Sequence, residues 1–263
     1  MPSTTLSKNL FVFDFDWTLI EADSDHWVME KLGGLTREEF ESTYKDVQWT
    51  DLQDMLLGRL FDRGVTKAHL EATLREIPMM PETIAALQLM KAQGSDLVIL
   101  SDANTFYVDT ILKAHGIDHL FSKIITNPSH FDEQGRLRVA RFHGLDKPPH
   151  GCPRLCAPNL CKGQEFQKVI ASQHWEQIVY MGDSTNDFCP STRLQSNGIV
   201  LARANLLLEK AIREHPDMVK AQVIYWSSPK DVLAATQAIF DVPSPKSLVT
   251  PALAVSEITQ SVY

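Results

Sequence analysis

Asp14 and Asp16 have the residue type and the spacing needed for covalent catalysis at one site. Both directly follow the apolar run of residues 10–13. At the end of an extended strand, two carboxylates spaced this way can both face a substrate, so that one attacks phosphorus while the other transfers protons. Alone, the Asp-x-Asp pair is a weak signal, because two acids that cap a loop have the same spacing.

Ser101 and Lys162 are the second and third candidates. Ser101 follows the apolar run of residues 97–100, and a hydroxyl there, together with the backbone N–H groups after it, can hold a phosphoryl oxygen. A plain helix N-cap is the alternative. Lys162 precedes a helix-like segment and could neutralise both the nucleophile and the transferred group. The alternative is a solvated surface lysine.

The fourth candidate is Gly-Asp-Ser-Thr-Asn-Asp at residues 182–187, which follows the apolar run of residues 178–181. Asp183 and Asp187 supply hard oxygen ligands of the kind that Mg²⁺ prefers. A strand-to-helix turn in which an Asp is the helix N-cap would have the same sequence. Each group has such an alternative, but four groups in order, each at a strand end or helix start, together indicate a phosphoryl-transfer site.

The elements that must position these residues alternate along the chain. The three apolar runs are typical of strands buried on both faces of a sheet. Weaker strand signals lie at residues 123–126, 198–201 and 222–226, and helix-like segments at 83–92, 106–114, 164–172 and 204–213. This alternation predicts an α/β fold with a doubly wound parallel sheet, whose carboxyl edge would gather the polar strand ends.

The first two strand ends lie about 85 residues apart, far more than one crossover helix requires. Helical apolar spacing within residues 25–80 predicts an inserted helical cap. Residues 1–24 and 81–240 are then the α/β core. Residues 241–263, with three prolines, are expected to form an irregular tail.

The bulk composition limits the class of partner. The chain has 263 residues and a formal net charge of −8, and an acidic balance disfavours nucleic acid. No apolar run approaches the roughly 20 residues of a membrane span, and the start of the chain lacks a signal-peptide core. Four clustered cysteines do not resemble a secreted disulfide scaffold. We therefore expect a cytoplasmic protein that acts on a small phosphorylated metabolite, without nucleic-acid or membrane partners.

These motifs resemble the phosphatases of the haloacid dehalogenase superfamily, which carry Asp-x-Asp, a strand ending in Ser or Thr, a Lys and Gly-Asp-x-x-x-Asp. Longer stretches resemble the phosphoethanolamine/phosphocholine phosphatase subgroup and its sister pyridoxal phosphate phosphatase. They are Asp14-Phe15-Asp16 with Ser24-Asp25, SDANTF at 101–106, Cys161-Lys162 and NDFCP at 186–190. The likeness covers about residues 10–226. Trp17 and Ser184 depart from the pattern and bear on substrate preference more than on activity.

The resemblance implies a role for each motif residue. Asp14 would carry an aspartyl-phosphate, and Asp16 would be the general acid and base. Ser101 would hold phosphoryl oxygens, and Lys162 would screen the charge of Asp14. The implied Mg²⁺ ligands are Asp14, the carbonyl of Asp16 and Asp183, with Asp187 supporting the shell. The second acid, Asp16, marks phosphate-transferring members and argues against a dehalogenase.

Asp25 and Asp102 are two further acids near the predicted site. Phosphate recognition does not need them, and poorly solvated they would repel an anionic substrate by a few kcal/mol. They favour a cationic leaving group, as in phosphoethanolamine or phosphocholine, and both match acids thought to recognise the amine in the subgroup. Helix capping is the alternative. Trp17 or Trp27 could add a cation–π face.

Other features fit less clearly. His150, Cys152, Cys156 and Cys161 group soft ligands that a structural zinc could use, although without CxxC pairs we favour reduced thiols in a loop. Cys189 is expected to be a buried thiol. His26, beside Trp27, either lines the pocket or covers a helix face. The basic stretch 136–141 is expected to be exposed rather than a nucleic-acid site.

Two other classes fit part of the pattern. A signalling receiver domain also has an acidic pocket, a Ser or Thr and a Lys on a parallel sheet, but it needs no cap and accepts phosphate on an internal strand. A catalytically silent binding module is disfavoured because the acids and the Lys are all present. A phosphomutase or phosphotransferase shares the first half-reaction.

Overall fold

A six-stranded parallel sheet, in the order β3-β2-β1-β6-β7-β8, forms the centre of the protein. The computed structural model describes residues 8–33, 46–148, 150–154 and 156–241. The strands are β1 (Lys8–Phe13), β2 (Asp96–Asn104), β3 (Lys123–Asn127), β6 (Trp175–Gly182), β7 (Ile199–Arg203) and β8 (Gln222–Trp226). This topology confirms the predicted doubly wound α/β fold.

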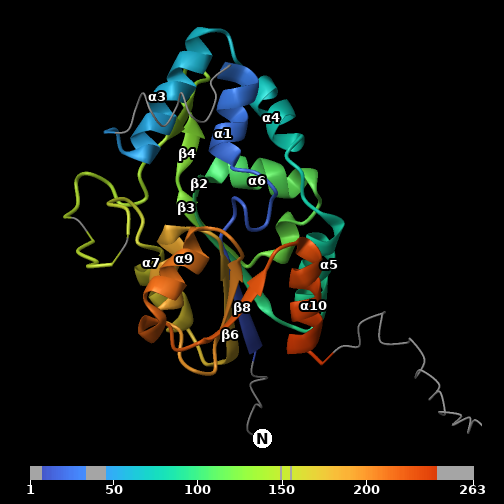
Figure 1. Ribbon diagram of the computed structural model, residues 1–263. Helices are drawn as coiled ribbons and strands as arrows, with labels where there is room; N and C mark the ends of the chain where they lie inside the picture. Colours follow the sequence, from blue (N-terminus) through green and yellow to red (C-terminus); the bar gives the residue numbers. More distant parts are fainter. Residues whose placement is uncertain (1–7, 34–45, 149, 155, 242–263) are drawn as a thin grey trace, which may run out of the picture.

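Helices cover both faces of the sheet (Figure 1). One face carries α5 (Pro81–Ala92), α6 (Thr105–Ala114) and α10 (Pro229–Ile239), and the other carries α7 (Lys162–Ile170), α8 (Phe188–Ser191) and α9 (Leu207–Glu214). Along β1, Phe11 and Phe13 pack into the hydrophobic cluster on the face covered by α5, α6 and α10. Leu10 and Val12 pack into the cluster on the opposite face, with α7, α8 and α9. Burial on both faces explains why β1 is an unbroken apolar run rather than an alternating one.

Three more helices lie between β1 and α5, beyond the carboxyl ends of the strands (Figure 1). They are α1 (Ser24–Val28), which continues into the π-helical turn η1 (Met29–Gly33), α3 (Trp49–Asp62) and α4 (Lys67–Arg75). No described helix is both long and apolar enough to cross a membrane. The division into a core of residues 1–24 and 81–240 and a cap of residues 25–80 remains a prediction. Of the predicted tail, only Asp241 lies within the described residues.

The hairpin of β4 (Ser129–Phe131) and β5 (Leu137–Val139) was not predicted, and it packs against α3. Asp54 of α3 accepts hydrogen bonds from Arg136, from Arg138 and from the backbone N–H of Val139. Arg141 pairs with Asp51. The expectation of an exposed basic stretch at 136–141 was therefore wrong, because acids of α3 draw these arginines onto the helix.

Some boundaries also differ from the predicted ones. Strand β2 continues to Asn104 instead of ending at residue 100, since Asn104 pairs with Asn127 of β3. The helix predicted from residue 204 begins at Leu207, because Asn205 adopts a left-handed conformation with φ of 64°. Short 3₁₀ turns occupy η2 (Asp118–Leu120), η3 (Thr185–Asp187) and η4 (Pro216–Met218).

Candidate active site

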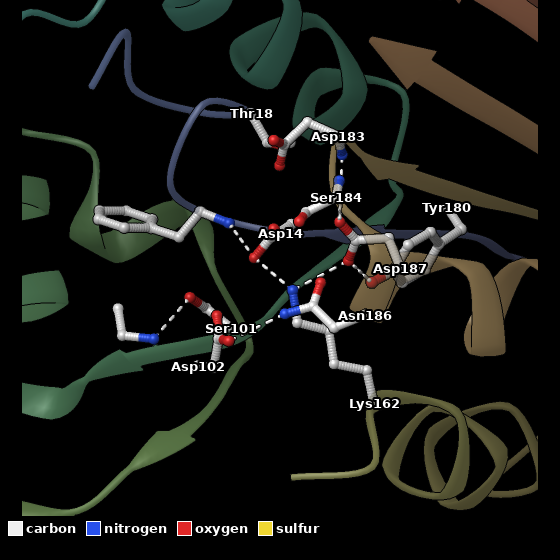
Figure 2. Close-up of polar contacts among 12 residues, drawn as sticks. Asp14, Thr18, Ser101, Asp102, Lys162, Tyr180, Asp183, Ser184, Asn186 and Asp187 are labelled. Carbon is white, nitrogen blue, oxygen red and sulfur yellow. Dashed lines mark hydrogen bonds and ion pairs between the residues drawn. The ribbon is translucent and has the colours of Figure 1, made fainter. Parts of the chain in front are cut away.

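Three predicted site residues, Asp14, Ser101 and Asp183, meet at the carboxyl edge of the adjacent strands β2, β1 and β6 (Figure 2). Asp14 follows β1 and extends its ladder by one step, since its N–H donates to the carbonyl of Met181 at 2.9 Å. Ser101 lies near the end of β2, and Asp183 directly follows β6. Parallel strands share one polar edge, so the strand order alone brings these residues together.

Lys162 is buried against two acids of this edge. Its Nζ lies 2.7 Å from Oδ1 of Asp14 and 2.9 Å from Oδ1 of Asp187, and the residue is 1% exposed. Burial acts to lower the pKa of Lys162, but the charges of Asp14 and Asp187 outweigh burial and raise that pKa. The ammonium therefore keeps its charge, and the alternative of a solvated surface lysine is excluded.

The carboxylate of Asp14 is held in place by two donors. Its Oδ1 accepts from the N–H of Phe15 at 2.7 Å as well as from Lys162. Burial raises the pKa of Asp14 well above its usual value, the charges of Asp187 and Asp183 add to the rise, and Lys162 opposes it. Burial and the neighbouring acids therefore oppose ionisation of Asp14, and positive charge beside it favours ionisation.

Asp14, Asp183 and Asp187 form a cluster suited to a hard cation. All three are buried, and one carboxylate oxygen from each lies within 4.8 Å of the others. Burial, followed by the charge of Asp187, raises the pKa of Asp183 to about 7. Three carboxyls face one ammonium, and their donor atoms are all oxygens. The residues present therefore fit Mg²⁺, which prefers oxygen ligands and would offset the repulsion.

Asp187 also organises the loop that carries Asp183. Its Oδ1 accepts from Lys162 and from the hydroxyl of Tyr180, and its Oδ2 accepts from the N–H groups of Asp183 and Ser184. A Cβ on Gly182 would lie 2.5 Å from Cγ of Asp187, so only glycine allows this approach. The N-cap of the following turn is Ser184. Asp183 is therefore not a helix cap, which was the alternative explanation for this segment of the sequence.

Asp16 lies on the tight loop between β1 and α1. Its Oδ1 accepts from the N–H of Ser24 at 2.9 Å. Burial, followed by the charges of Asp23 and Asp25, raises the pKa of Asp16 well above its usual value. Trp17 turns the chain here with φ of 53°, and its N–H donates to the carbonyl of Ala22. Asp16 is therefore an acid that holds its proton more tightly than a solvated aspartate.

A cavity of about 610 Å³ opens in front of these residues, within the size range of small-molecule sites. Its described wall includes six aspartates: Asp14, Asp16, Asp23, Asp25, Asp102 and Asp183. The aromatic part of the wall is Trp17 and Trp49. Arg203 is the one cationic side chain in that wall, and it already pairs with Glu21. The described wall of the cavity is therefore predominantly acidic.

The wall residues to which the sequence analysis gave no role include Asp23, Trp49, Asn186 and Arg203. Arg203 ends β7, and the rule that polar strand ends share one edge would have found it. Asn186 lies inside the recognised 182–187 motif, and it donates to Oδ2 of Asp102 at 2.9 Å. Trp49 begins α3 and reaches the site only through the tertiary fold, so no local signal marks it.

Lys162 and Asp187 contact Asp14 or its partners without lining the described wall, and Ser101, Trp27 and His26 also lie away from it. Ser101 is fully buried, its Oγ accepts from the N–H of Ala103, and its phosphate-binding role remains a prediction. Trp27 donates to the carbonyl of Thr73 and is not in the described wall, whereas Trp17, the other residue suggested for a cation–π face, is. The ring of His26 stands beside Trp49, with ring centroids 5.1 Å apart, and covers a helix instead of lining the pocket.

Comparison with known proteins gives consistent results. The model of the Putative Phosphatase family matches residues 9–240. Inorganic pyrophosphatase 2 of Arabidopsis thaliana is 38% identical over 234 residues, covering 86% of this chain and 83% of the relative. A thiamine phosphate phosphatase-like protein of the same plant is 38% identical over 230 residues, covering 86% and 93%. Pyridoxal phosphate phosphatase PHOSPHO2 of Bos taurus is 31% identical over 244 residues, covering 88% and 98%.

Solved structures support the same fold. The HAD family hydrolase t0658 of Salmonella enterica serovar Typhi superposes with a TM-score of 0.56 at 16% identity, covering 83% of this chain and 67% of that one. Such a distant likeness bears on the fold alone, whereas the family match covers most of the chain. The chain therefore belongs to the Putative Phosphatase family, within the haloacid dehalogenase fold, and is a phosphoric monoester hydrolase.

Proposed function

We propose that this protein is a Mg²⁺-dependent phosphatase that forms an aspartyl-phosphate on Asp14 and acts on a small phosphomonoester with a cationic leaving group. Phosphoethanolamine and phosphocholine have this chemistry. The observation that carries the proposal is the cavity itself, whose described wall holds six aspartates, including Asp14 with its buried partner Lys162. The one cationic residue of that wall, Arg203, already pairs with Glu21.

The first half-reaction uses Asp14 and Asp16. A carboxylate oxygen of Asp14 attacks phosphorus, and the bond from phosphorus to the leaving oxygen breaks as the new bond forms. The released alkoxide takes the proton of Asp16, whose raised pKa keeps that proton available. Lys162 holds Asp14 in place and screens its charge through the contact at 2.7 Å.

The second half-reaction restores the enzyme. Asp16, now ionised, takes a proton from water, and the resulting hydroxide attacks phosphorus so that the bond to Asp14 breaks and inorganic phosphate leaves. Mg²⁺, held by Asp14 and Asp183 with Asp187 behind them, would supply charge neutralisation at the nucleophile and the phosphoryl oxygens. Tyr180 and the backbone around Gly182 keep Asp187 in position throughout.

The preference for a cationic leaving group rests on Asp25 and Asp102. Neither is a helix cap, because Asp23 caps α1 and Asn104 caps α6. Oδ2 of Asp25 accepts from the indole of Trp49 at 2.7 Å, and Asp102 accepts from Asn186. Both acids line the cavity. Burial, followed by the charge of Asp23, raises the pKa of Asp25 well above its usual value, and a cation on the substrate would favour the ionised carboxylate.

The names of the relatives differ in whether the substrate that they give has a cationic leaving group. Thiamine phosphate carries a cationic ring on its leaving group, and one relative is named a thiamine phosphate phosphatase-like protein. Inorganic pyrophosphate is wholly anionic, so the acidic cavity disfavours the activity named for the plant pyrophosphatase. Pyridoxal phosphate is the remaining alternative, since PHOSPHO2 of Bos taurus is named for it.

Asp25→Asn and Asp102→Asn should each raise KM for phosphocholine and phosphoethanolamine by roughly 5- to 30-fold. This corresponds to about 1–2 kcal/mol for one unscreened charge pair. Phenyl phosphate, whose leaving group has no cation, should be little affected. Steady-state phosphate release by the wild type and both variants measures this. Asp109→Asn, which removes an exposed acid of α6, is the matched control and should change neither substrate class.

Two outcomes would contradict this reading. Equal losses on cationic and uncharged substrates would mean that Asp25 and Asp102 are structural. A wild type that strongly prefers pyridoxal phosphate over both amines would assign the sister activity instead.

Exhaustive chelation should abolish turnover, and added Mg²⁺ should restore it. The reason is that the crowded carboxyls of Asp14, Asp183 and Asp187 need a hard cation to ionise together. Ca²⁺ should inhibit, because its larger and looser shell would misplace the nucleophile. Asp183→Asn should need a higher Mg²⁺ concentration for half-maximal activity. Full activity after chelation, with no magnesium found by elemental analysis, would refute the requirement.

A further inference from the structure

All four cysteines of the chain meet at one point, although they come from two separate segments. Cys152 and Cys156 lie in the irregular loop before α7, Cys161 is the N-cap of α7, and Cys189 lies in α8. The sulfur of Cys156 is 3.6 Å from that of Cys152 and 3.5 Å from that of Cys161. The sulfur of Cys189 is 3.7 Å from that of Cys152 and 3.9 Å from that of Cys161.

These separations match a tetrahedral thiolate site. Zinc binds cysteine sulfur at about 2.3 Å, so the edge of a tetrahedron of four sulfurs is about 3.8 Å long. The four cysteines are free, and no pair is joined in a disulfide. From this geometry we propose that Cys152, Cys156, Cys161 and Cys189 bind a structural zinc ion, with loss of their thiol protons.

His150 is not a ligand in this proposal. Its Nε2 contacts the carbonyl of Ala157 at 2.8 Å, and its Nδ1 accepts from the N–H of Cys152 at 3.1 Å. Both ring nitrogens therefore contact the loop backbone, which shapes the segment between the cysteines. The sequence suggested His150 with Cys152, Cys156 and Cys161 as a possible set of ligands. The geometry favours Cys189, from a distant segment, in place of His150.

The packing around Cys189 favours a built site over a chance cluster. A Cβ on Gly163 would lie 2.3 Å from the sulfur of Cys189, so only glycine leaves room for that sulfur. Cys161 and Cys189 are buried, whereas Cys152 and Cys156 are partly accessible and offer a route of entry. Four protein ligands leave no open position for substrate, which is the arrangement of a structural zinc rather than a catalytic one.

Two of the proposed zinc ligands are close in sequence to Lys162 and Asp187. Cys161 immediately precedes Lys162, and Cys189 is two residues after Asp187. The ion would tie the start of α7 to α8 and so hold the contact between Lys162 and Asp187 at 2.9 Å. The cysteines are then positioning residues, and their loss should lower kcat through Lys162 more than it raises KM.

The test is the metal content of the full chain, purified without a polyhistidine tag. Elemental analysis should find about one zinc per chain in the wild type, and a mercurial reagent should release it as it titrates four thiols. Replacement by Co²⁺ should give the visible absorption of a tetrahedral cobalt–thiolate centre. His150→Ala and Asp183→Asn should retain one zinc, since neither residue is a ligand. Cys156→Ser should lose most of it.

Gly163→Ala provides a second test in case Cys156→Ser does not fold. It keeps all four thiols, but its Cβ would displace the sulfur of Cys189. It should weaken zinc binding at least about tenfold in competition with a chelator. Gly33→Ala is its control, since a Cβ there meets only an ordinary contact at 3.5 Å. A wild type that holds no zinc after reduction and reconstitution would overturn the proposal. So would zinc binding in Gly163→Ala equal to that of the wild type.

Discussion

Asp14→Asn should abolish turnover of every phosphomonoester, by at least about 10⁴-fold in kcat, while the protein still folds. Asparagine has the shape of aspartate, and its carbonyl oxygen can still accept from the N–H of Phe15 and from Lys162. Its neutral amide cannot attack phosphorus, so no covalent intermediate can form. Phosphate release measures the loss, and the thermal unfolding midpoint should stay within a few degrees of that of the wild type.

Acid quenching during turnover provides a direct test of the intermediate. Mass spectrometry should locate phosphate on the wild-type peptide that contains Asp14 and on no peptide of the variant. The matched control is Asp96→Asn, because Asp96 begins the adjacent strand β2 at the opposite edge of the sheet and pairs with Lys8. That variant should keep full activity. Near-normal turnover by Asp14→Asn, or phosphate on another residue, would sink the assignment.

Asp16→Asn should lower kcat by about 10²- to 10⁴-fold, the usual weight of general acid–base catalysis. The loss in the first step should depend on the leaving group. An alkoxide such as that of choline needs a proton, whereas 4-nitrophenolate leaves without one. The variant should therefore form the aspartyl-phosphate from 4-nitrophenyl phosphate at a rate closer to that of the wild type. Single-turnover kinetics with both substrates measures this difference.

The second step should then become limiting in Asp16→Asn. In the variant no general base takes a proton from the attacking water, so the enzyme phosphorylated on Asp14 should accumulate. Its formation should be seen as a burst of 4-nitrophenol followed by slow turnover. Asp96→Asn again serves as the control and should show wild-type rates. If both substrates lose the same factor and no intermediate accumulates, Asp16 acts only through its hydrogen bond with Ser24.

Much of the site's location followed from the sequence because it depends on local patterns. The apolar runs before Asp14, Ser101 and Asp183 mark strands buried on both faces, and burial is a property of each short segment. In a parallel sheet, such strands must release the chain at one edge. The fold class and the convergence of these residues on one edge were therefore predictable, although the length of β2 beyond residue 100 depended on its pairing with β3.

Other features depended on contacts between distant segments. Nothing around Lys162 distinguishes a buried ammonium from a surface lysine, and only the packing of α7 against the sheet brings it to Asp14. The local sequence allowed Asp25 to be a helix cap. Only the structure shows that Asp23 is the N-cap of α1.

The cysteine cluster shows the same limit. Three thiols are close in sequence, but Cys189 joins them because α8 folds against the start of α7. Trp49 reaches the cavity only because α3 lies above the edge of the sheet. Periodicity determines which face of a segment is buried. Which side chains then share a site depends on strand order and helix packing, and these are settled by the free energy of the whole chain.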